Sequence, residues 1–187
     1  MRDDGPHMAL ALVGLALAPA ALVLARLDLE RPFLAAFAAA LAIDVALDNL
    51  RAPAAPPAWH GAARSLAELA LRVAIPLALA WLRPYLLETE PLSFWSIVAA
   101  LAVPTAFAFI KYGRLPRYRT RAGLVAFYLA GGATLFLIAT GATWPLRLAA
   151  IGLVVAALEE IAVTAVLPDA RAPVRSLPAA LRLRRDH

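Results

Sequence analysis

Six apolar segments, each about long enough to cross a bilayer, fill almost all of this 187-residue chain. A helix needs roughly 20 apolar residues to span a membrane. Hydrophobic residues make up 63% of the chain and charged residues 17%, whereas soluble domains have about 45–50% and about 25%. We therefore expect one all-α integral membrane domain over residues 1–187, a single bundle of six transmembrane helices. The predicted spans are 8–25, 33–50, 65–82, 92–110, 123–141 and 144–167, followed by a short basic tail at 168–187.

Several classes of site are excluded by composition and motif. The chain has no cysteine, so disulfides, thiolate metal sites and cysteine nucleophiles are ruled out. Its three histidines, His7, His60 and His187, lie outside the predicted spans and show no metal-ligand spacing. No phosphate-binding P-loop or nucleophile elbow is present. Gly131 and Gly132 are expected to let helices pack closely.

The basic residues fall mainly on one side of the predicted spans. With both termini on one side, thirteen Lys and Arg residues lie there, four lie on the other side, and Arg72 lies within a span. The positive-inside rule then makes both termini cytoplasmic. The thirteen are Arg2, Arg51, Arg64, Lys111, Arg114, Arg117, Arg119, Arg121, Arg171, Arg175, Arg182, Arg184 and Arg185.

Location and partners follow from the same features. Heavy use of Ala, Leu, Arg and Pro is typical of GC-rich bacterial genomes, so we expect a multi-pass protein of the bacterial inner membrane. The net charge of +5 is explained by loops that set topology and contact anionic lipid headgroups. Membrane lipids are therefore the expected partners, and no nucleic acid is expected.

Carboxylates within the apolar segments need a protein or water environment, since lipid strongly disfavours charge. Asp44 and Asp48 are four residues apart and share one face of the second span. Glu68 lies at a similar depth near the start of the third span. Short connections make these two helices antiparallel neighbours. The three carboxylates could therefore converge, as a Mg²⁺ site or a proton-abstracting base requires.

A dense basic loop between the fourth and fifth spans suggests phosphate binding. Five cations and two tyrosines occur within residues 111–121. Arginine offers forked donors that match phosphate oxygens. The predicted phosphate-binding residues are Arg51, Lys111, Arg114, Arg117, Arg119 and Arg121.

Ion pairing is the alternative explanation of the same acids. Arg64 and Arg72 lie four residues on either side of Glu68, so all three share a helix face. A guanidinium would pair with Asp48 or Glu68 and would repel Mg²⁺. Glu159 and Glu160 are also expected to form ion pairs or hydrogen bonds, with a small proton-coupled transporter as the other reading.

The chain resembles the CDP-alcohol phosphatidyltransferases, six-helix membrane enzymes that transfer a phosphatidyl or phospho-alcohol group from a CDP-linked donor to a hydroxyl acceptor and release CMP. The likeness covers length, helix count and several segments in the right order. These segments are residues 43–49, 65–71, 112–116, 157–161, 167–168 and 174–177.

The family's signature of four aspartates, D-x-x-D-G-x-x-A-R-x8-G-x3-D-x3-D, is degenerate in this chain. If Asp48 is the second aspartate, Val45 stands at the first position and Asn49 at the glycine. If Glu68 is the fourth, Arg64 stands at the third and the spacing is two residues shorter. Asp44 could take the first position only if its helix shifted by one residue.

What the resemblance implies is a phospholipid-synthesis protein whose activity is weakened or lost. If it is active, Asp44, Asp48 and Glu68 would be the catalytic residues and the ligands of Mg²⁺ or Mn²⁺, and a CDP-linked lipid or alcohol would be the substrate. The alternative is a non-catalytic paralogue that binds such a ligand, forms a homodimer or pairs with an active relative.

Overall fold

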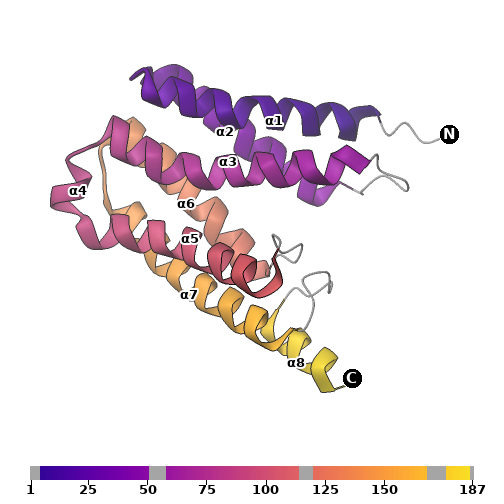
Figure 1. Ribbon diagram of the computed structural model, residues 1–187. Coiled ribbons are helices and arrows are strands. Elements are labelled where there is room, and N and C mark those ends of the chain that lie inside the picture. The colour runs from indigo at the N-terminus through magenta and orange to yellow at the C-terminus, as the bar shows by residue number, and fades with distance from the viewer. Residues whose placement is uncertain (1–4, 51–57, 114–119, 168–175, 186–187) are drawn as a thin grey trace. The chain divides into compact units, whose positions relative to one another are not determined.

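The computed structural model describes residues 5–50, 58–113, 120–167 and 176–185, which form eight helices and no strand (Figure 1). The bounds of the helices are α1 Gly5–Arg26, α2 Glu30–Asn49, α3 Ala58–Leu82, α4 Leu86–Thr89, α5 Pro91–Tyr112, α6 Arg121–Thr140, α7 Trp144–Val166 and α8 Leu177–Arg185.

Six of these helices are long and apolar enough to cross a membrane: α1, α2, α3, α5, α6 and α7. The predicted all-α class and the six apolar segments are thereby confirmed. Only 28–44% of the most apolar part of each helix is buried inside the protein. Large apolar side chains such as Leu92 and Ile110 are therefore open to the surroundings, as is expected where lipid is the solvent.

Helix ends follow local chemistry. Pro91 opens α5, where a missing N–H costs nothing. Gly113 ends that helix in the left-handed conformation, with φ 66°, and Gly141 does the same after α6, with φ 77°. Two helices were not predicted. They are the short α4 and α8, which occupies residues 177–185 of the segment expected to be a tail.

Tryptophans mark one end of three long helices. Trp81 lies at the end of α3, Trp95 near the start of α5 and Trp144 at the start of α7, and all three are exposed. Amphipathic indole rings concentrate at both membrane interfaces, so exposed tryptophans near helix ends are compatible with helices long enough to span a bilayer.

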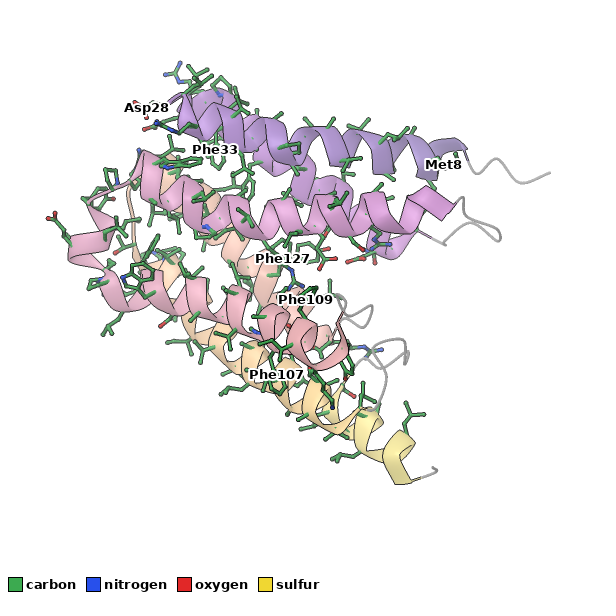
Figure 2. The ribbon with its side chains drawn as sticks, viewed as in Figure 1. Met8, Asp28, Phe33, Phe107, Phe109 and Phe127 are labelled. Atoms are coloured by element: carbon green, nitrogen blue, oxygen red, sulfur yellow. The ribbon has the colours of Figure 1, made fainter. Side chains whose placement is uncertain are left out.

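The chain folds as two compact units. The first unit is Met1–Glu88 with Thr134–Gly141, in which α1 packs against both α2 and α3. Phe33, labelled in Figure 2, is fully buried and stacks on Phe37 with ring centroids 5.3 Å apart. Small residues such as Ala18 and Ala21 are also fully buried on α1, which allows close approach of the helices.

The second unit is Thr89–Ala133 with Ala142–His187. In it α5 packs against α7, and α8 packs at the end of α7. Val163, Leu167 and Ala180 form a buried cluster at that end. Phe109, labelled in Figure 2, is 54% exposed, so α5 keeps an exposed apolar side chain near its end.

Candidate functional site

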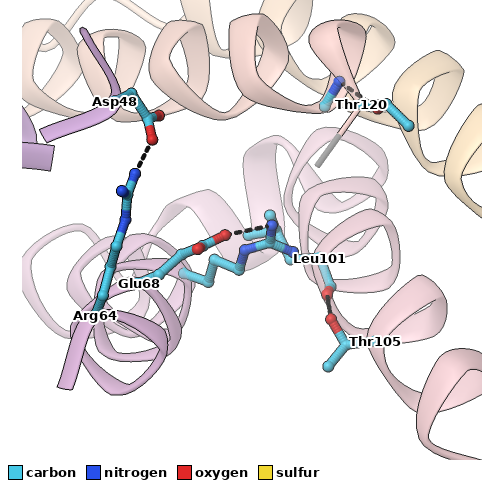
Figure 3. Close-up of polar contacts among 8 residues, drawn as sticks. Asp48, Arg64, Glu68, Leu101, Thr105 and Thr120 are labelled. Atoms are coloured by element: carbon cyan, nitrogen blue, oxygen red, sulfur yellow. Dashed lines mark hydrogen bonds and ion pairs between the residues drawn. The ribbon is translucent and has the colours of Figure 1, made fainter. Parts of the chain in front are cut away.

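Two arginines of α3 engage two of the predicted catalytic acids. Arg64 donates to Asp48 Oδ1 and thereby joins α3 to α2. Arg72 Nη2 donates to Glu68 Oε1 over 2.8 Å within α3. Figure 3 shows both contacts as dashed lines. Their four-residue spacing places Arg64, Glu68 and Arg72 along one face of α3, and α2 brings Asp48 to that face.

These pairs are largely withdrawn from water. The side chains are 26% and 18% exposed for Arg64 and Asp48, and 20% and 17% exposed for Arg72 and Glu68. Asp44, one turn before Asp48, is buried at 5% exposure. A guanidinium keeps its charge and has no acceptor atom. Each pair therefore carries little net charge, although it contains a carboxylate.

A divalent cation does not fit this arrangement. Among residues 5–50, 58–113, 120–167 and 176–185, no three His, Asp or Glu side chains come close enough together to hold a metal ion. An arginine also contacts both Asp48 and Glu68. Mg²⁺ demands near-octahedral oxygen ligands, and a neighbouring guanidinium opposes its charge.

Lys111 binds the end of α7 in the second unit. Its Nζ donates to the carbonyl oxygens of Thr164, Ala165 and Leu167 at 2.7, 3.0 and 2.9 Å. The Tyr112 hydroxyl lies 3.0 Å from the carbonyl oxygens of both Thr164 and Leu167, which share its single proton. The last carbonyls of a helix lack internal partners. Since an ammonium has three donors, those of Lys111 are all engaged here.

Of the other predicted phosphate-binding residues, the structure describes Arg121 alone. Arg121 opens α6 and is exposed. Arg51, Arg114, Arg117 and Arg119 lie outside the described residues. Their role in phosphate binding stays a prediction.

Glu159 and Glu160 point to different partners, as adjacent positions on a helix must. Glu159 Oε1 accepts the backbone N–H of Leu177 over 3.2 Å, at the start of α8. Glu160 lies against Gly123, where an added Cβ would collide with Oε1. Thr120 is fully buried and its hydroxyl accepts the Gly123 N–H over 3.0 Å. Threonine immediately before a helix is an N-cap signal that could have identified this contact.

Arg83, which directly follows α3, forms an ion pair that residue spacing did not predict. In the first unit Arg83 donates to Glu30 Oε2 at 3.1 Å and to the carbonyl of Ile138 at 2.7 Å. The hydrogen bond to Glu30 raises the pKa of Arg83, despite the opposing effect of burial. Glu30 is the first residue of α2, where the helix dipole favours an acid, and its position could have indicated this pair from the sequence.

Glu90 and Arg147 form the corresponding pair in the second unit. Arg147 Nε lies 2.9 and 3.1 Å from the two Glu90 carboxylate oxygens. This hydrogen bonding lowers the pKa of Glu90, although desolvation opposes the shift.

Comparison with protein-family models, with curated proteins and with solved structures found no match to this chain.

Proposed function

We propose that this chain is a membrane protein of the CDP-alcohol phosphatidyltransferase type that has lost transferase activity and acts by binding a CDP-linked lipid or alcohol, or an active relative. The observation that carries the loss of activity is the pairing of Asp48 with Arg64 and of Glu68 with Arg72. We place the protein in the cytoplasmic membrane of a bacterium.

The charge balance supports the loss of activity. The family reaction asks carboxylate-bound metal to neutralise a diphosphate and an acid to take the acceptor's hydroxyl proton. Here the two carboxylates of Asp48 and Glu68 accept donors from guanidinium groups. Breaking such a pair to bind metal would leave a cation without its counterion in a partly buried site.

The basic residues support retention of a phosphate-containing ligand. Arg121 is exposed at the start of α6, next to the dense basic segment identified in the sequence. Arginine at a helix start can bind phosphate through its own donors and adds to the positive end of the helix dipole.

CMP release tests the loss of activity. The purified protein in lipid nanodiscs is mixed with CDP-diacylglycerol, candidate hydroxyl acceptors and Mg²⁺ or Mn²⁺, beside an active phosphatidyltransferase in the same lipid. We expect CMP from the active enzyme alone. Metal-dependent CMP release by this chain that Asp48→Asn abolishes and Asp28→Asn leaves intact would overturn the proposal. Asp28 is a suitable control because it lies in the exposed turn between α1 and α2.

Ligand binding is tested separately by thermal unfolding. CDP-diacylglycerol should raise the unfolding temperature more than diacylglycerol does, because only the former offers phosphates. Arg121→Gln should reduce that difference. Equal effects of the two lipids would refute binding through phosphate and leave pairing with an active relative as the surviving half of the proposal.

A further inference from the structure

The C-terminal helix α8 is fastened to the end of the last apolar helix. Ala180 is fully buried against Val163, in the last turn of α7, and Leu167, the C-cap of that helix. Glu159 Oε1 holds the backbone N–H of Leu177, the first residue of α8. Figure 1 shows α8 at the end of α7. Because α7 is long and apolar enough to span a bilayer, a helix that packs at its end would lie at the level of the membrane surface.

The two faces of α8 differ in polarity. At 100° per residue, Ala179, Ala180 and Leu183 lie on one side of the helix, whereas Leu181 points roughly 160° away from Leu183. Ala179 and Ala180 pack at the end of α7, and Leu183 flanks that contact and is 37% exposed. Its apolar surface is therefore left uncovered beside the end of a span, where lipid is the nearest apolar phase.

The charge of α8 is of one sign. The helix contains three arginines, Arg182, Arg184 and Arg185, and no acid. Arg182 is exposed and, at 100° per residue, lies on the side of the helix opposite Ala180. A helix with a basic face and an apolar face lies in the membrane interface and is attracted to anionic lipid.

We infer that α8 is an in-plane membrane helix whose Leu183 enters the bilayer surface and whose basic side, which carries Arg182, binds anionic phospholipid headgroups. Charge complementarity selects anionic over zwitterionic lipid. The helix contains both an apolar contact and a basic segment, which is the combination that reversible interfacial binding requires. This role is independent of whether the chain has transferase activity.

Site-directed spin labelling of the full chain tests this inference. The chain has no cysteine, so Leu181→Cys, Leu183→Cys and Arg182→Cys each give one labelled position. Collision with oxygen, which concentrates in lipid, is compared with collision with a neutral nickel chelate, which stays in water. In phosphatidylglycerol nanodiscs we expect position 183 to favour oxygen, and positions 181 and 182, which lie on the other side of the helix, to favour the chelate.

A change in the charge of the lipid provides a second test. In phosphatidylcholine nanodiscs the label at position 183 should become more accessible to the chelate. Adding Arg182→Gln should reduce the ratio of inserted to free α8 roughly fivefold in the anionic lipid, and Arg182→Lys should preserve it. Water exposure of all three positions in anionic lipid would overturn the inference and favour a protein as the partner of this face. Equal insertion in both lipids would overturn the headgroup recognition.

Discussion

The Glu160 carboxylate lies directly against Gly123, in the space where any other residue would carry its Cβ. This contact joins α7 to the first turn of α6, where the Thr120 hydroxyl accepts the Gly123 N–H. A carboxylate near a helix start is stabilised by the helix dipole and by the unpaired N–H groups there. A glycine at position 123 therefore positions an acid that lipid would otherwise disfavour.

Two glycines of α6 should respond oppositely to alanine. At Gly132 an added Cβ would meet no atom within 4 Å, so close packing does not require glycine there. Gly132→Ala should stabilise the helix by up to about 1 kcal/mol, because alanine has the higher helix propensity. Gly123→Ala should lose about 1–3 kcal/mol through overpacking against Glu160 and Thr120. Thermal unfolding in detergent or nanodiscs measures both.

A Glu160→Ala background separates the contact with Glu160 from other effects at position 123. Removing the carboxylate should make Gly123→Ala less costly, although the Thr120 hydroxyl still lies 2.9 Å from the added Cβ. The Gly132→Ala effect should be the same in both backgrounds. A penalty for Gly123→Ala that does not change when Glu160 is removed would contradict the proposed contact.

Membrane orientation can be tested with reporter fusions. Fusions near residues 55 and 117 and at the C-terminus should report a cytoplasmic location, because the Lys and Arg residues concentrate there. Fusions near residues 28, 87 and 142 should report an external location. An external position for residue 117 would reverse the topology and move the predicted phosphate-binding loop to the wrong face of the membrane.

The six long helices could be predicted because their signal is local. About 20 consecutive apolar residues suffice to indicate a span, whatever lies around it. The two short helices lack that signal. α4 has four residues with Leu86 fully buried, and α8 packs through Ala180 onto α7. Helices this short are marginal in isolation, so their formation depends on contacts that only the fold provides.

The same distinction applies to the candidate site. The Glu68 and Arg72 pair follows from a four-residue spacing on one helix. The pair of Arg83 with Glu30 joins residues 53 positions apart, so it depends on how the helices pack. Lys111 likewise looked like a phosphate ligand in its basic loop, yet its ammonium binds three carbonyls at the end of α7. Sequence spacing identified the charges but could not assign such distant partners.

Acid should weaken the second unit through Glu90. Hydrogen bonds from Arg147 lower the pKa of this carboxyl below its ordinary value of 4.5. The stabilisation is therefore complete above pH 4.5 and is lost as pH falls through the lower pKa of the folded state. Its size is modest, because Arg147 is largely exposed to water.

Unfolding temperatures recorded from neutral to acidic pH test this expectation. Glu90→Gln should lower stability at neutral pH and reduce the loss of stability on acidification. Glu88→Gln is the matched control, since Glu88 is an exposed acid two residues earlier and should change neither quantity appreciably. Parallel pH profiles for wild type and Glu90→Gln would show that the pair with Arg147 does not stabilise the fold.

The Arg64 and Asp48 pair provides the most direct test of the charge balance at the candidate site. Asp48→Asn should destabilise the protein by about 1–3 kcal/mol, between the values for exposed and fully buried pairs, because both side chains are partly exposed. Arg64→Gln should also destabilise it, and the double variant should lose less than the sum of the two. The same double-mutant cycle in the presence of Mg²⁺ distinguishes an ion pair from a metal site. If Asp48→Asn does not change the free energy of unfolding and Mg²⁺ stabilises wild type but not this variant, Asp48 binds a metal ion and its contact with Arg64 does not stabilise the fold.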